Sequence, residues 1–160
     1  MQDRVAAAST PGLRAELDTQ SGAITPPWLE WLAHLAATLD KAPQRLSSVS
    51  LTAQAASIAS TALKTGLTAG LYRVSYYARI TTAAGTSSSL TVTFGWTDGA
   101  VTPSQSGAAI TGNTTTTIQS GTLLIRVDAN TAVNYSTTYA STPASAMQHS
   151  LDLFLEEMPT

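Results

Sequence analysis

The stretch that decides the fold spans residues 70–98 and has the sequence GLYRVSYYARITTAAGTSSSLTVTFGWTD. Apolar or aromatic side chains stand at every second position in both of its halves: Tyr72, Val74, Tyr76, Ala78 and Ile80, then Leu90, Val92, Phe94 and Trp96. Successive side chains of a β-strand point to opposite faces, so this period predicts two strands that each bury one face. The connecting residues 82–89 are all small or hydroxyl-bearing, which predicts that the two strands pair as a hairpin.

The same alternation recurs in most of the chain beyond residue 45. It predicts strands at residues 48–52, 122–128, 131–141 and 147–156. Residues 53–65 are compatible with a short helix or a strand, and we favour the strand because of their serine, threonine and isoleucine content. About six to eight strands at short spacing, with no helix between them, predict a mainly β domain over residues 46–160, an antiparallel β-sandwich or jelly roll.

One amphipathic helix is predicted for residues 25–42, where the sequence is TPPWLEWLAHLAATLDKA. Pro27 suits the first helical position, and Pro43 ends the helix. At about 100° per residue, one broad face collects Trp28, Trp31, Leu32, Leu35 and Leu39. A helix of this length is marginal alone, so this face requires a partner: the chain's own β-domain or, slightly favoured, a neighbouring subunit.

Residues 1–24 show no sustained hydrophobic period. We expect an extended arm there, and simple disorder is an equally weighted alternative. This start of the chain also lacks the apolar core and basic flank of a secretory signal. The expected organisation is therefore an arm at residues 1–24, a helix at 25–42 and a β-domain at 46–160.

The composition is poor in charge and rich in hydroxyl groups. Charged residues make up 11 % of the chain, against roughly 25 % in ordinary soluble domains, and serine and threonine fill about a quarter of it. The net charge of −2 gives no basic field for nucleic acid or for an anionic membrane. There is no cysteine, which excludes disulfides and thiolate zinc sites. No segment approaches the roughly 20 apolar residues of a membrane-spanning helix.

The sequence contains no recognisable catalytic or metal-binding constellation. Its two histidines, His34 and His149, do not have the spacing of a zinc motif. The adjacent Glu156 and Glu157 fit solvated charges better than a glycosidase pair. The strand aromatics share the parity of the aliphatic residues, so we favour core packing over sugar binding for them. We therefore expect a protein that is not an enzyme, with no catalytic residue, no metal and no cofactor.

A few large apolar residues are predicted on the outer face of their strands. These residues are Leu71, Tyr77, Leu124 and Phe154. Between residues 46 and 150 the only charged positions are Lys64, Arg73, Arg79, Asp98, Arg126 and Asp128. A lone sandwich normally carries more surface charge than this. We therefore expect the four apolar residues at contacts between subunits of a closed oligomer.

The order of parts resembles small virion proteins of tailed bacteriophages. In these proteins a Trp-containing helix near the N-terminus attaches to the particle, as ITPPWLEWLAHLAATL at residues 24–39 would, and a Ser/Thr-rich β-domain follows. The segments LTAGLYRVSYYARIT (67–81), SLTVTFGWTD (89–98) and SLDLFLEEMP (150–159) are similar to trimeric jelly-roll knobs of head fibres, cement proteins and tail fibres. One departure is that Leu32 follows Trp31, where an aromatic pair is commoner.

The resemblance implies a homotrimeric structural protein of the virion, of the head-decoration, cement or head-fibre type. It assigns anchoring to Trp28, Leu29, Trp31, Leu32 and Leu35. The partners would be other virion proteins, either the major capsid protein or tail and portal components, with no nucleic acid and no membrane. Two alternatives stay open: a tail-fibre or adaptor component, and a carbohydrate-binding module for receptor recognition.

Overall fold

A computed structural model describes residues 26–39, 42–142 and 146–159 of the chain. The chain divides into two compact units, residues 1–42 and residues 43–158. The arm predicted for residues 1–24 lies outside the described residues. The two units are described separately below.

The first unit contains helix α1, Pro26–Leu39. Its start agrees with the two consecutive prolines, because a proline in the first turn lacks only an N–H that would have no partner in the helix. The helix is shorter than the predicted range of residues 25–42. It is too short to cross a membrane, and no helix within the described ranges is long and apolar enough to do so.

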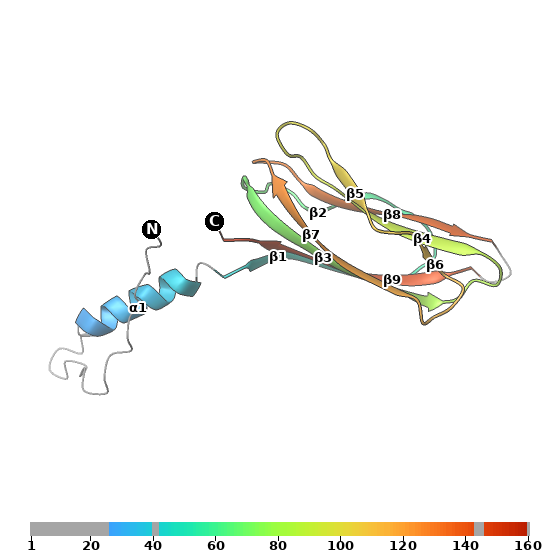
Figure 1. Ribbon diagram of the computed structural model, residues 1–160, viewed down its shortest axis with the longest axis horizontal. Helices are drawn as coiled ribbons and strands as arrows, with labels where there is room; N and C mark the ends of the chain where they lie inside the picture. Colours follow the sequence, from blue (N-terminus) through green and yellow to red (C-terminus); the bar gives the residue numbers. More distant parts are fainter. Residues whose placement is uncertain (1–25, 40–41, 143–145, 160) are drawn as a thin grey trace, which may run out of the picture. The chain divides into compact units, whose positions relative to one another are not determined.

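The second unit is built from nine strands (Figure 1). They are β1 (Gln44–Gln54), β2 (Ile58–Lys64), β3 (Gly70–Thr82), β4 (Ser88–Gly95), β5 (Ser104–Ser106), β6 (Ile110–Thr111), β7 (Ile118–Val127), β8 (Val133–Ser141) and β9 (Gln148–Glu157). The strand interpretation of residues 53–65 is confirmed by the end of β1 and by β2. β1 begins at Gln44, two residues before the predicted start of the β-domain.

The strands form two antiparallel sheets that face each other as a sandwich (Figure 1). One sheet has the order β1-β9-β3-β7, and the other has the order β2-β8-β4-β5, with β6 also paired to β4. The chain crosses from one sheet to the other after β1, β2, β3, β6, β7 and β8. These crossings and strand orders are those of a jelly roll, so the predicted fold class is confirmed.

The predicted hairpin between the two strands of residues 70–98 is wrong. β3 pairs with β7 and β9, whereas β4 pairs with β8, β5 and β6 in the opposite sheet. The connection between β3 and β4 therefore arches across the core. The period of two identifies the buried face of each strand correctly, but it carries no information about which strand is the neighbour.

The core lies between the sheets and is formed by the alternating positions that the sequence indicates. The fully buried side chains of β3 and β4 are Tyr72, Val74, Ala78, Ile80, Leu90 and Val92, each with 0 % exposure. Leu151, Leu153 and Leu155 of β9 are equally buried. Tyr76, Phe94 and Tyr135 are also buried, while Trp96 and Tyr139 pack against the core from partly buried positions. Core packing is therefore confirmed for the six strand aromatics.

Candidate functional site

The outer face of the β1-β9-β3-β7 sheet carries the apolar residues predicted to face outward. Leu124 on β7 is 62 % exposed and Tyr77 on β3 is 38 % exposed, whereas Leu71 and Phe154 are half-buried. Ile118, which the sequence analysis did not single out, adds a second strongly exposed apolar side chain on β7. β7 is the last strand of its sheet, so these two residues lie along an unpaired edge.

Phe154 is partly covered by its own chain, and polar contacts run along the same sheet. The Arg45 guanidinium carbon lies 4.3 Å from the centroid of the Phe154 ring, a cation–π contact. Arg73, the cross-strand partner of Leu124, makes an ion pair of 2.6 Å with Glu156. Glu157 accepts a hydrogen bond from the Thr68 hydroxyl at 3.1 Å. The adjacent glutamates thus take part in the packing of the sheet and do not face each other across a cleft.

A hollow of about 610 Å³ lies on the same outer face, over β1, β9 and β3. Most of its lining residues have polar side chains, and it holds the aromatic ring of Tyr77 together with two opposite charges, Arg79 and Asp152. The other lining residues are Ser50, Thr52, Ala53, Thr81, Thr82, Gln148 and Ser150. The sequence analysis placed Tyr77 on this face but did not associate it with Asp152 and Gln148, which lie far along the chain.

Helix α1 exposes an apolar stripe. Leu29, Leu32 and Leu35 are 51 %, 40 % and 38 % exposed, and Trp28 and Trp31 are half-buried. The two indole rings meet edge to face, with their centroids 5.5 Å apart. The described part of the first unit therefore contains the five residues predicted to anchor the chain, and three of them present leucine side chains to solvent.

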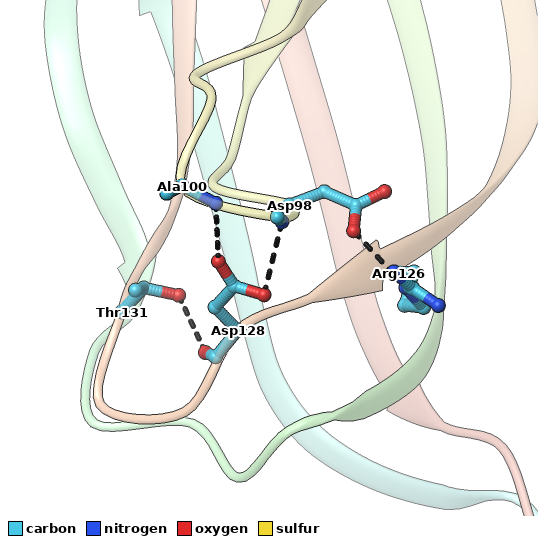
Figure 2. A network of polar contacts seen from close by, with 6 residues as sticks. Asp98, Ala100, Arg126, Asp128 and Thr131 are labelled. Atoms are coloured by element: carbon cyan, nitrogen blue, oxygen red, sulfur yellow. Dashed lines mark hydrogen bonds and ion pairs between the residues drawn. The ribbon is translucent and has the colours of Figure 1, made fainter.

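One end of the sandwich is fixed by the carboxylate of Asp128, just beyond β7 (Figure 2). It accepts hydrogen bonds from the backbone N–H groups of Gly99 and Ala100, at 3.1 and 3.0 Å. Both residues have a left-handed backbone, with φ of 59° and 63°, which is unfavourable for Ala100. These bonds lower the pKa of Asp128 and attach the loop after β4 to the opposite sheet.

Arg126 and Thr131 complete this network. The Arg126 guanidinium donates to the Asp98 carboxylate at 3.0 Å, and the Thr131 hydroxyl donates to the backbone carbonyl of Asp128 at 2.7 Å (Figure 2). Each charged group is matched by a partner that holds the loop in place. The arrangement fits a structural role, because its carboxylates are held by backbone and guanidinium groups at a loop.

His149 is a core residue. Its ring has 0 % exposure and lies 6.1 Å from the ring of Tyr139. Neither ring nitrogen has a hydrogen-bond partner of good geometry among the described residues. Burial lowers the pKa of His149, and the backbone of Gln54 opposes this shift only in part. No group of three potential metal ligands gathers around it or elsewhere in the described residues.

The chain was also compared with known proteins. No protein-family model matches it, and no curated protein matches it. Among solved structures, one similar chain belongs to the work "Bacillus endospore appendages form a novel family of disulfide-linked pili". The two chains are 14 % identical with a TM-score of 0.36, over 76 % of this chain and 94 % of the other. A likeness this slight supports no inference about function.

Proposed function

We propose that this chain is a non-enzymatic structural protein of a tailed-phage particle, attached by α1 and presenting its jelly roll as a trimeric knob. The observation that carries the proposal is the exposed leucine stripe of α1, in a unit that is separate from the sandwich. Exposure of the Leu29, Leu32 and Leu35 side chains to water is unfavourable, and burying their apolar surface would lower the free energy. A groove on another virion protein would bury them.

The edge strand β7 supports association between copies of the jelly roll. Ile118 and Leu124 are 55 % and 62 % exposed there, and Arg126 is the strand's one charged residue. Natural sheet edges usually carry several charges that discourage pairing. The threefold symmetry of the proposal comes from the resemblance to phage knobs, and the head is favoured over the tail because a short anchored knob suits a decoration protein.

Attachment is tested with the double substitution Trp28→Ala and Trp31→Ala. Phage particles that lack this chain are mixed with purified protein and sedimented, and the bound protein is quantified. Each tryptophan at a packed interface is worth more than about 1 kcal/mol, so we expect binding to fall at least about tenfold. The melting temperature of the sandwich should stay unchanged, because α1 belongs to the other unit.

Glu30→Gln is the matched control, since Glu30 is an exposed polar residue of the same helix. It should bind particles as the unchanged protein does. Normal binding of the double variant would contradict anchoring by α1. A large fall in its melting temperature would instead place the two tryptophans in an intramolecular core.

A further inference from the structure

The hollow on the outer face of β1, β9 and β3 differs in chemistry from the rest of the surface. The sandwich has few charged residues, and four of them form ion pairs: Arg73 binds Glu156, and Arg126 binds Asp98. Arg79 and Asp152 both line the hollow, but neither takes part in the two ion pairs that the described residues form. Opposite charges thus border one hollow without forming an ion pair with each other.

The backbone register explains this placement. Tyr77 stands opposite Asp152 across the β3–β9 pair, and Arg79 stands opposite Ser150. Asp152 and Arg79 are therefore diagonal neighbours on one face, where cross-strand side chains still reach a common ligand. On the other side, Ser50 of β1 stands opposite Asp152 and donates to its Oδ1 atom at 2.6 Å. This bond orients the carboxylate and leaves its second oxygen available.

Further hydrogen-bonding groups surround the charges. Gln148 accepts from the Thr82 hydroxyl through Oε1 at 3.3 Å, so its amide nitrogen keeps two donors for a ligand. The Thr81 hydroxyl is buried from solvent and has no hydrogen-bond partner among the described residues. A buried polar atom without a partner costs free energy.

We propose that this hollow binds a neutral saccharide, as a hexopyranose unit of a glycan chain. The partly exposed ring of Tyr77 offers a flat surface for the apolar C–H face of a sugar. Asp152 accepts from sugar hydroxyls, while Arg79 and Gln148 donate to them. The two charges cancel, so the hollow favours a neutral sugar over a uronic acid. Its volume of about 610 Å³ falls within the usual range for small-molecule sites.

This binding function is independent of attachment through α1. The hollow spans β1, β9 and β3, and of these strands only β3 pairs with β7, where Arg79 stands opposite Ile118. Contacts between copies along β7 would leave β1 and β9 uncovered. None of the α1 residues proposed for attachment lines the hollow, so a failure of particle attachment would not contradict the saccharide site, and the reverse is also true.

Affinity electrophoresis of the full chain tests the proposal, in native gels that contain dextran, mannan or galactan, with hyaluronan as the acidic probe. At least one neutral polysaccharide should retard the protein at neutral pH. The variants Tyr77→Ala, Arg79→Met and Asp152→Asn should each weaken the apparent affinity by about tenfold or more, the effect expected from losing one good ligand contact. Circular dichroism verifies that each variant is folded. If Tyr77→Ala unfolds, the other two variants decide whether the hollow binds the polysaccharide.

Two matched controls lie outside the hollow. Val101→Ala truncates an apolar side chain that is 63 % exposed, and Asp98→Asn removes a carboxylate from the loop network. Both should be retarded as the unchanged protein is. The proposal is overturned if no neutral polysaccharide retards the protein, if only hyaluronan does, or if the three hollow variants bind as well as the controls.

Discussion

Tyr76 lies over the backbone of Gly121, its antiparallel partner across the β3–β7 pair. A Cβ atom on Gly121 would stand 2.6 Å from the Cε1 atom of the Tyr76 ring. The hydroxyl of the same tyrosine would meet a Cβ on Gly107 at 2.6 Å, in the loop after β5. One buried aromatic side chain thus packs on two glycines, one from each side of the sandwich, and burial raises the pKa of its hydroxyl.

This packing predicts that Gly121→Ala destabilises the sandwich by about 1–3 kcal/mol, the usual cost of forcing extra volume into a packed core. Thermal or urea unfolding measures the change. Gly95→Ala is the control, because a Cβ on Gly95 would meet nothing closer than 3.9 Å, and its stability should change little. Equal stability of the two variants would contradict the close approach of Tyr76 to Gly121.

A second prediction concerns the buried His149. Burial lowers its folded pKa below the ordinary 6.5, so below pH 6.5 the unfolded chain takes up a proton more readily than the folded chain. The free energy of unfolding is therefore highest above pH 6.5 and falls as the pH drops toward the folded pKa, by at most about 1.4 kcal/mol per pH unit. His149→Leu should remove this pH dependence.

The same variant should also be more stable than the unchanged protein at pH 7, because it removes two buried nitrogens without good hydrogen-bond partners. Melting temperatures measured from pH 7.5 down to about pH 5 test both statements. His34→Leu, in the other unit, should keep the pH dependence. If the melting temperature of His149→Leu falls with pH as steeply as that of the unchanged protein, a group other than His149 causes the pH dependence.

The Asp128 carboxylate gives a third prediction, at lower pH. Its folded pKa lies below the ordinary 3.8 because the N–H groups of Ala100 and Gly99 donate to it. The stabilisation is present above pH 3.8 and is lost as the pH falls through the folded pKa. Asp128→Asn should be less stable at pH 7, and its difference from the unchanged protein should shrink below pH 3.8.

Thermal unfolding across this pH range measures the difference. Asp98→Asn serves as the comparison, since it breaks only an exposed ion pair with Arg126, a kind of contact that contributes little. A stability difference for Asp128→Asn that stays constant down to pH 2 would contradict the role of its charge. An equal loss of stability in the two aspartate variants would show that the Asp128 contacts contribute no more than the exposed ion pair of Asp98.

A fourth prediction concerns association of the sandwich. A fragment of residues 43–160 should remain folded and rich in β-structure by circular dichroism, because those residues contain the whole sandwich. Light scattering should give the mass of a trimer. The double variant Ile118→Gln and Leu124→Gln should be monomeric and still folded by circular dichroism, since both side chains are exposed in the single chain.

Val101→Gln is the matched control, because Val101 is equally exposed but lies outside β7, and it should stay trimeric. A fragment that is monomeric at micromolar concentration would contradict self-association. A dimer would contradict the threefold symmetry alone, and a double variant that stays trimeric would place the contact away from β7.

The sequence by itself determined which side chains are buried. Alternation is a local property of the extended chain, so the buried faces of β3, β4, β8 and β9 follow from residue order alone. The position of α1 is also set locally, because its prolines and its apolar period lie within one short segment. The outward placement of Tyr77 and Leu124 was also predicted by parity.

Only the tertiary structure decided which strands are neighbours. β3 and β4 lie in opposite sheets although a short loop joins them, because the pairing of strands depends on the closure of the whole sandwich. The same closure brings Asp152 of β9 beside Tyr77 of β3 and places Gly121 under Tyr76. These residues are far apart in the chain, and no local period relates them, so the hollow and the glycine contacts exist only in the folded protein.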